Sequence, residues 1–405
     1  MHQLEINHHC QQLKYRAKKM LNATADYRIE SFQLQSPSDI QQQWISLEQQ
    51  SDCAFFLSWV WVGNWLKTFV PQAVVLRVWH QQQLVAIGIV VEHTERRHGM
   101  LFSKTLRLHQ TGKPDCDQIF IEYNGFLTHR QYDKLQLEAA CIDYLNEHFS
   151  WQELTLAGIE QQQFSLFQQL LALPVYQHWS TATYGVDLCA LSQSQVQYAA
   201  TLSANTRYQI TRCLKLYQQK GEVKLVRMAS PEAALASFHK MANWHIARWG
   251  DGPQQSGFVN AKFLKFHKNL LLSAAENIEV LELQVAGETV ASIYNFIYNN
   301  KVYFYLGVAK PETSKQLKPG LLCHYLAIAR YQELGFSYYD FMGGEARYKQ
   351  QLAQKQKQLM GVSFQRPLLR FRLERFVRYI KHQFQHLLLQ PRLRTESAKE
   401  APYEK

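Results

Sequence analysis

Four ionisable residues lie close together near the end of the chain: Asp340, Glu345, Tyr348 and Lys349. Group transfer needs a base that takes a proton from the acceptor and a donor or cation that stabilises an oxyanion, and these residue types supply both. Asp340 stands among aromatic residues, where partial burial would raise its pKa and suit it to act as a base. Its alternative role is an ion pair with Lys349 or Arg347. Glu345, at the mouth of the Gly-Gly turn, is the freer base candidate, whereas Lys349 could hold an anionic oxygen or be a solvated side chain.

A second chemical signal is the loop from Lys315 to Gly320 (KQLKPG), which precedes a predicted helix. A helix N-terminus offers free N–H groups and a partial positive charge, which suit a pyrophosphate. Gly320 and Leu321 would let a phosphate approach the backbone, and Lys315 and Lys318 would add positive charge. The alternative is an ordinary Pro-Gly turn that opens a helix.

Composition limits the class of protein. The 405 residues are enough for two domains with separate cores, and the 46% hydrophobic content excludes wholesale disorder. The seven cysteines are scattered without CxxC spacing, which indicates a reducing compartment and predicts no metal site. Without a signal-peptide pattern or a stretch of about 20 apolar residues, the sequence predicts a cytoplasmic protein. A net charge of +11 favours anionic partners, among them a nucleotide cofactor, a phospholipid surface or a nucleic acid.

The positioning elements come from a weak internal repeat of about 200 residues, a length that fits two related domains. In the first half, a helix at 55–69 is followed by strands at 74–79 and 84–91 around a polar turn. In the second half, a helix at 258–274 is followed by strands at 278–285 and 289–298. Both strand pairs are hairpin candidates.

The second half predicts further elements in the order β-α-α-β-β-β-α-β-α-β. It opens with a strand at 223–228 and a helix that Ser230 caps and Pro231 begins. The other elements are strands at 301–308, 337–342 and 359–364 and helices at 320–334 and 346–353.

This order, together with the local residues, resembles the GNAT acyltransferase fold. The residues that carry the resemblance are NTRYQITRCLKLYQQKG (205–221), HIARWG (245–250), KPGLLCHYLAI (318–328) and YYDFMGGEARYK (338–349). They are similar to the BioF2-like or CelD-type acetyltransferases, the double-GNAT relatives of the FemABX aminoacyltransferases. The resemblance implies an α/β fold with a mixed sheet and tandem GNAT-like lobes, the N-terminal one degenerate. The lobes would span 28–190 and 195–365, between a polar tail (1–27) and a basic helix (366–390) with a disordered tail (391–405).

The resemblance also implies a donor site. Acyl-CoA, with acetyl-CoA the expected form, would lie between two strands that splay apart, 303–308 and 338–342. The backbone of Leu306, Gly307 and Val308 would bind the pantetheine arm, and the 315–320 loop would bind the pyrophosphate, although the usual Arg/Gln-x-x-Gly-x-Gly/Ala pattern is Lys-x-x-Lys-Pro-Gly here. Tyr348 stands where many GNAT enzymes place an acid for the departing thiolate.

The acceptor would lie along the first helix of the second lobe. His245 and Trp249 share one face of that helix, although a core histidine is the plainer interpretation. Arg207, on a basic helix that joins the lobes, could receive an anionic acceptor or belong to a solvated face.

From Arg366 onward, an apolar helical stripe (Leu369, Leu373, Phe376, Ile380, Phe384 and Leu387) runs beside arginines. A basic amphipathic helix can lie on an anionic membrane, including peripherally on the inner membrane. We expect instead that this helix docks on the second lobe.

Three functions remain open. The first is transfer of an acyl group from acyl-CoA or an acyl carrier protein to an amine or hydroxyl, for example on a small-molecule, envelope or exopolysaccharide precursor. The second is FemABX-like transfer of an aminoacyl group from tRNA. The third is a non-catalytic scaffold that kept the fold.

Overall fold

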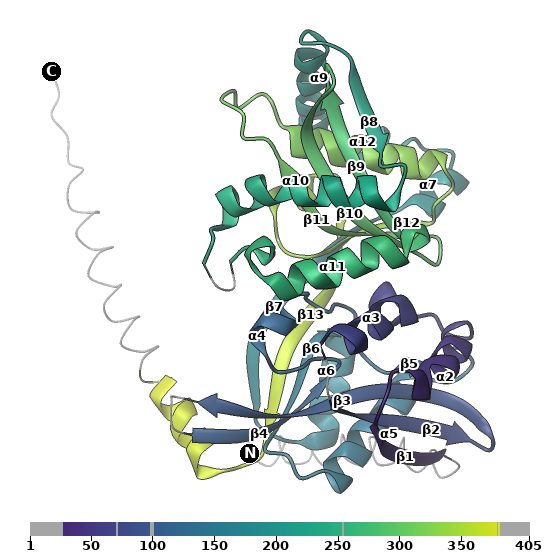
Figure 1. The fold of residues 1–405 in the computed structure, drawn as a ribbon, viewed down its shortest axis with the longest axis vertical. Helices are drawn as coiled ribbons and strands as arrows, with labels where there is room; N and C mark the ends of the chain where they lie inside the picture. Colours follow the sequence, from purple (N-terminus) through teal and green to yellow (C-terminus); the bar gives the residue numbers. More distant parts are fainter. Residues whose placement is uncertain (1–26, 70–71, 98–100, 253–254, 379, 381–405) are drawn as a thin grey trace, which may run out of the picture.

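The computed structural model describes residues 27–69, 72–97, 101–252, 255–378 and 380. They form two lobes that share one mixed sheet of 13 strands (Figure 1). The strand order is β1-β2-β3-β4-β6-β13-β7-β12-β11-β10-β9-β8, with β5 paired to β3 outside this path. The α/β fold with a mixed sheet and two lobes, predicted from the sequence, is confirmed.

The first lobe packs helices on both faces of its part of the sheet. Helices α2 and α3 cover one face, and α5 and α6 cover the other. Its elements are β1 (Tyr27–Leu34), α2 (Ser38–Glu48), α3 (Trp59–Phe69), β2 (Ala73–His80), β3 (Gln83–Arg97), β4 (Leu101–Leu108), α4 (Pro114–Asp117), β5 (Leu127–Thr128), α5 (Lys134–His148), β6 (Glu153–Glu160), α6 (Gln161–Leu171) and β7 (Val175–Asp187).

The second lobe repeats this plan in the predicted order. Helices α10 and α11 cover one face of its strands, and α9 and α12 cover the other. Its elements are α7 (Leu188–Gln193), α8 (Tyr198–Thr201), α9 (Ala204–Gln218), β8 (Val223–Arg227), α10 (Pro231–Trp249), α11 (Ala261–Ser273), β9 (Ile278–Val285), β10 (Glu288–Tyr298), β11 (Lys301–Ala309), α12 (Pro319–Glu333), β12 (Tyr338–Gly343), α13 (Arg347–Leu352) and β13 (Gln354–Gln365).

The local signals act as predicted at the helix ends. The Ser230 side chain accepts a hydrogen bond from the Ala233 N–H, and Pro231 is the first residue of α10. Gly335 adopts a φ of +79° just after α12, which the glycine tolerates at low cost. The predicted helix at 55–69 is instead broken at Ser58, into a 3₁₀ turn (Phe55–Leu57) and α3, because Ser58 is extended.

The two lobes exchange their last strands, which the sequence did not predict. Strand β7 ends the first lobe in the chain, yet it lies between β12 and β13 and pairs with both. Its residues Ala182, Tyr184 and Val186 belong to the second lobe's core, whereas Met360 and Val362 of β13 belong to the first lobe's core. A domain boundary near residue 190 therefore separates the two lobes along the chain, although their strands form one continuous sheet.

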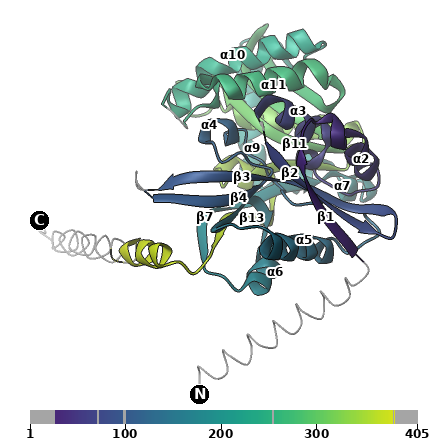
Figure 2. The same ribbon diagram turned by 60° about the horizontal axis from the view of Figure 1, so that its bottom comes forward.

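A shared aromatic core holds the lobes together on one side of the sheet. It joins α2 and α3 to α10 and α11, and Figure 2 shows these helices gathered on that side. Phe55 stacks on Phe296 of β10 with ring centroids 4.4 Å apart, and Trp61 meets Phe266 of α11 at 4.8 Å. Burial of such rings is a large stabilising term, so the lobes form one unit.

After β13 the chain continues as a helix over residues 369–378, which lies against the first lobe. The prediction that this helix docks on the second lobe is therefore wrong. The predicted N-terminal tail and the chain beyond residue 380 lie outside the described residues. Within the described part of the chain, no helix combines the length and apolarity needed to cross a membrane.

Candidate active site

A gap opens between two neighbouring strands of the second lobe. Strands β11 and β12 pair in parallel at only three positions, Lys301–Tyr303 with Tyr338–Asp340. Beyond Tyr303, β11 stays on β10 as far as Ala309, while β12 continues on β7 as far as Gly343. The β11 edge at Leu306 and Gly307 is half-buried and is not paired with another described strand. Such an edge can bind an extended ligand by strand-like hydrogen bonds.

Helix α12 begins at the open end of this gap. Pro319 is its first residue, and the Lys318 side chain at the N-cap makes no capping hydrogen bond. A Cβ on Gly320 would meet only the Cβ of Ala309, 3.6 Å away, so the helix start lies beside the last residue of β11 and has open space. Lys315 is exposed. This geometry leaves backbone N–H groups available to an anion.

The end of β12 is held in a tight bend by Lys349. The residue is buried, and its ammonium donates to the carbonyl oxygens of Phe341 at 2.7 Å, of Met342 at 3.4 Å and of Gly343. Met342 has a φ of +59°, which is unusual for a residue with a side chain. A lysine has three protons to donate, and all three are used here. The solvated lysine considered as an alternative is therefore wrong.

An arm of the first lobe, residues 119–124, reaches across to this bend. The Gly343 N–H donates to Glu122 Oε2 at 2.8 Å, and the Tyr123 hydroxyl donates to Asp340 Oδ2 at 2.7 Å. The other carboxylate oxygen, Asp340 Oδ1, accepts from the Met342 N–H at 2.6 Å. These bonds replace the ion pair to Lys349 or Arg347 that was considered for Asp340. The centre thus combines residues from both lobes.

The two carboxylates of this centre titrate near neutrality. Burial raises the pKa of Asp340 to about 6, against the lowering effect of the Tyr123 hydroxyl and the Met342 N–H. Burial raises the pKa of Glu122 to about 7, although part of its side chain remains accessible. Burial also lowers the pKa of Lys349. Carboxylates shifted in this direction are suited to proton transfer at neutral pH.

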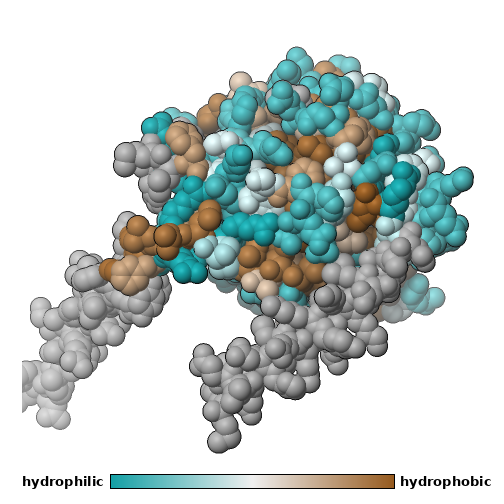
Figure 3. Space-filling view, turned by 90° about the horizontal axis from the view of Figure 1, so that it is seen from below, coloured by the Kyte–Doolittle hydropathy of each residue, from teal (hydrophilic) through white to brown (hydrophobic). Residues whose placement is uncertain are grey.

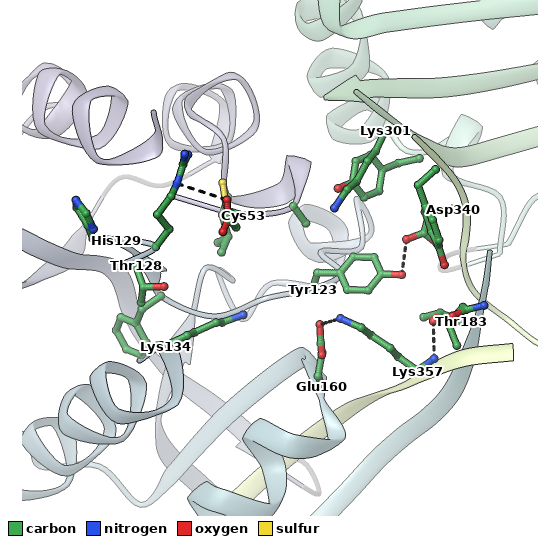
Figure 4. Close-up of a pocket in the computed structure, with 18 of the residues that line it drawn as sticks. Cys53, Tyr123, Thr128, His129, Lys134, Glu160, Thr183, Lys301, Asp340 and Lys357 are labelled. Carbon is green, nitrogen blue, oxygen red and sulfur yellow. Dashed lines mark hydrogen bonds and ion pairs between the residues drawn. The ribbon is translucent and has the colours of Figure 1, made fainter. Parts of the chain in front are cut away.

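Asp340 also forms one wall of a cavity of about 570 Å³ between the lobes. Figure 4 shows Tyr123, Asp340 and Lys301 on one side of this cavity and Cys53, His129 and Lys134 on the other. The cationic side chains that line it are Arg130, Lys134, Lys301 and Lys357, of which Lys357 is paired with Glu160 at 2.7 Å and Arg130 with Asp52 at 3.5 Å. Because Asp340 is the last β12 residue paired with β11, the cavity meets the gap at its narrow end.

The corresponding gap in the first lobe is closed. Strands β4 and β6 also pair at only three positions and then separate. The buried Asn124 side chain bridges them, since its Nδ2 donates to the carbonyl oxygens of Leu108 and Ala157, each at 3.0 Å. The arm packs closely on β6, where a Cβ on Gly158 would lie 2.3 Å from the Ile121 carbonyl oxygen. The Asn124 side chain and the arm therefore bridge the separated strands of the first lobe.

The remaining residues of the predicted catalytic group differ in position. The Tyr348 ring stacks on His324 of α12 with centroids 5.0 Å apart and also contacts Phe304 and Phe341, so it spans both splayed strands. Glu345 is exposed in the loop between β12 and α13. Tyr348 therefore packs between the splayed strands, whereas Glu345 is exposed to solvent.

The three predicted acceptor residues do not share one groove. His245 bonds the Ser256 hydroxyl at 2.8 Å, and Trp249 is 53% exposed beneath the Arg248 guanidinium. Both lie on α10. Arg207 lies on α9, which covers the opposite face of the sheet, and it donates to the carbonyl oxygen of Leu202.

Sequence reasoning missed Glu122, Tyr123 and the cationic lining from the first lobe. The QIFIEYNGF segment (118–126) has no periodicity that marks it as functional. Its unusual backbone, with positive φ at Phe120 and Tyr123, appears only in the structure.

Comparison with known proteins agrees with this geometry. Residues 204–350 match the family described as acetyltransferase (GNAT) domain. This range holds the gap, the start of α12 and the β12 bend. No curated protein sequence matches the chain.

The chain is also similar to solved structures. The crystal structure of FemX superposes with a TM-score of 0.52 at 10% identity, covering 82% of this chain and 96% of that chain. A tandem GNAT protein from the clavulanic acid biosynthesis pathway superposes with a TM-score of 0.46 at 10% identity. The match covers 84% of this chain and 98% of that chain. The C-terminal domain of a putative lysylphosphatidylglycerol synthetase from Agrobacterium fabrum superposes with a TM-score of 0.47 at 9% identity. The match covers 82% of this chain and 93% of that chain. The similarity to FemX shows a shared fold, and the other two structures superpose with lower TM-scores.

Proposed function

We propose that the acetyltransferase (GNAT) domain of residues 204–350 transfers an acetyl or other acyl group from acyl-CoA, or an acyl carrier protein, to an amine or hydroxyl. The observation that carries this proposal is the gap between β11 and β12, which ends at the Asp340–Tyr123 pair and opens at the start of α12. A thioester arm needs an open strand edge, an anion site at one end and a proton acceptor at the other. Along β11, Asp340 lies at Tyr303, the open edge follows at Leu306 and Gly307, and the start of α12 lies beside Ala309.

The donor would enter from the α12 end. Its pyrophosphate would bind the N–H groups of Gly320 and Leu321, with charge from Lys315 and Lys318. The Lys318 ammonium is 2.7 Å from Gln209 Oε1, an exchangeable contact on the neighbouring helix α9. The pantetheine arm would pair with the β11 backbone at Leu306, Gly307 and Val308, because Lys349 and Glu122 already occupy polar backbone groups of β12.

Asp340 would act as the base. The acceptor, bound in the inter-lobe cavity, attacks the thioester carbonyl carbon with its nitrogen or oxygen, and its proton passes to the Asp340 carboxylate. The tetrahedral intermediate then collapses, the carbon–sulfur bond breaks and the thiolate leaves. A pKa of about 6 keeps Asp340 ionised at neutral pH and still basic enough for this transfer.

The neighbouring residues would support this step in different ways. Tyr348 would donate its proton to the thiolate, and burial, which raises its pKa to about 12, keeps the phenol protonated until then. Lys349 would act as a positioning residue, because its ammonium is used in fixing the β12 bend. Glu345, which is exposed, stays a second candidate base. His245 and Trp249, which were predicted to contact the acceptor, are not among the residues that line the cavity.

The acceptor would be a polar molecule with negative charge, such as an envelope or exopolysaccharide precursor. Lys134 and Lys301 lie at the cavity with nitrogen atoms available to an anion, and Thr128 and Tyr123 offer hydroxyl groups (Figure 4). Such an acceptor suits an enzyme in the cytoplasm that works peripherally at the inner membrane surface.

Calorimetric titration of acetyl-CoA into the full-length protein tests the proposal. We expect binding with one site for each chain, weakened when Lys318 is replaced by alanine. Lack of binding by the folded protein, to acetyl-CoA and to longer acyl-CoA alike, would contradict a coenzyme A donor.

The FemX-like fold and the net charge of +11 favour one alternative, an aminoacyl-tRNA donor. Binding of RNA that weakens steeply with salt, in a protein that does not bind acyl-CoA, would select it. A non-catalytic scaffold would bind neither donor, and it would show no turnover.

A further inference from the structure

The helix that follows β13 carries its apolar side chains on the outside. Leu369, Leu373, Phe376 and Val377 are 79%, 63%, 59% and 43% exposed, and Ile380 is 36% exposed. Their spacing places them along one face of the helix. We call this face the apolar ridge. Figure 3 shows it as a brown patch on the part of the chain that projects from the body of the protein.

The opposite face of this helix is charged and holds it to the first lobe. Glu374 is buried and pairs with Arg97 of β3 at 2.7 Å. Arg370 donates to the Phe102 carbonyl oxygen of β4 at 2.6 Å, and Arg366 donates to the Asn146 carbonyl oxygen at 3.0 Å. An ordinary surface helix buries its apolar face and exposes its charges. This helix is inverted, and polar contacts fix the inversion.

Single exposed apolar residues need no explanation, but a contiguous set on one face marks an interaction site. The apolar ridge is such a set. Phe102 of β4 is 59% exposed but is not part of it, because side chains alternate along a strand and its neighbour Ser103 is the one on the side of Glu153 and Arg97, where the helix lies.

The charges around the apolar ridge indicate what covers it. Arg372 is exposed on the ridge side, and Arg375 and Arg378 are half-buried beside it. Between residues 366 and 380, Glu374 is the single acid, and it is buried in its ion pairs. The outer surface of this helix is therefore apolar and positive.

We propose that the apolar ridge inserts into the interface of an anionic lipid bilayer, with the arginines among the headgroups. Apolar side chains flanked by arginine and lysine suit the boundary between headgroups and acyl chains. A second copy of this chain fits less well, because two such surfaces brought together would oppose positive charges, whereas anionic lipids neutralise them. This surface takes no part in the proposed acyl transfer and is tested separately from it.

Vesicle co-sedimentation of the full-length protein tests this inference. We expect binding to vesicles of phosphatidylglycerol mixed with phosphatidylcholine, at least about tenfold weaker binding to phosphatidylcholine alone, and loss of binding at high salt. The double variant L373S/F376S should bind the anionic vesicles at least about tenfold more weakly, since it removes apolar contact without changing the charge. Both side chains are exposed, so its melting temperature should stay that of the wild type.

The matched control is L272S/L334S, which removes two exposed leucines from the second lobe and should bind vesicles as the wild type does. Failure of the wild type to bind anionic vesicles, or equal binding by L373S/F376S, would overturn the inference. A dimer in solution that L373S/F376S converts to monomer would also overturn it, because a second copy would then be the partner. Acetyl-CoA binding, measured on the same samples, reports on the donor site independently.

Discussion

The Tyr123 hydroxyl of the first lobe donates a 2.7 Å hydrogen bond to Oδ2 of Asp340 in the second lobe. The bond joins the arm at 119–124 to the narrow end of the gap between β11 and β12. Under the proposed function, this bond brings residues of both lobes to one centre, whereas Asn124 bridges the separated strands within the first lobe.

Replacing Tyr123 by phenylalanine should shift the pH dependence of turnover. The Tyr123 hydroxyl lowers the pKa of Asp340, so its loss should raise that pKa above about 6. A base must be deprotonated, so activity falls as the pH drops through its pKa. We expect the acidic limb of the kcat/KM profile to move up by about one pH unit, the scale of one hydrogen bond to a charged group. An unmoved limb would mean that Asp340 is not the titrating base.

The variant D340N should separate the two candidate bases. We expect turnover to fall about 10²- to 10⁴-fold, the usual contribution of a general base. Acetyl-CoA affinity should change little, because the side chain faces the acceptor cavity. E345Q should lower turnover far less than D340N does. The matched control is E333Q, at an exposed position at the end of α12. A larger loss in E345Q than in D340N would reverse the assignment.

The start of α12 gives a prediction that separates folding from binding. In G320A, the added Cβ would meet only Ala309 at 3.6 Å, and alanine favours a helix by up to about 1 kcal/mol over glycine. The variant should therefore be at least as stable as the wild type. It should bind acetyl-CoA about tenfold more weakly, because the Cβ occupies space that a phosphate needs. Thermal unfolding and calorimetry on one sample check both parts, and unchanged affinity would remove Gly320 from the donor site.

Asn124 should be important for stability rather than for ligand binding. N124A would leave the buried carbonyl oxygens of Leu108 and Ala157 without their donor, at a cost of about 2–4 kcal/mol in the free energy of unfolding. Denaturant titration measures this cost. N205A, at an exposed position in α9, should change the free energy of unfolding by less than about 0.5 kcal/mol. A similar small effect in N124A would show that the first-lobe gap is not closed by this side chain.

The second lobe could be predicted from the sequence because its signals are local. Ser230 and Pro231 mark the start of α10, Gly335 marks the end of α12, and each hairpin has its own turn. The exchange of β7 and β13 could not be predicted, because both segments look like ordinary strands and pairing partners are not encoded locally. The residues of the arm were missed for the same reason, since Glu122 acquires its role only through Gly343 of the other lobe.

For the C-terminal helix, the sequence predicted the helix but not which of its faces is buried. Its apolar period correctly predicted a helix, but the prediction assumed that the apolar face is the buried one. Instead, Glu374 and Phe371 face the protein, while Leu369 and Leu373 face outward. Burial depends on what lies opposite each face, and the ion pair of Arg97 with Glu374 joins positions far apart in the chain.

Hydrogen exchange of the full-length protein with and without acetyl-CoA tests most directly whether the gap holds the donor. The account predicts slower exchange at residues 304–309 of β11 and 319–323 of α12, with no change at the first-lobe equivalents, 105–108 and 153–158. Protection confined to the first lobe, or binding of acetyl-CoA without protection at β11, would contradict it.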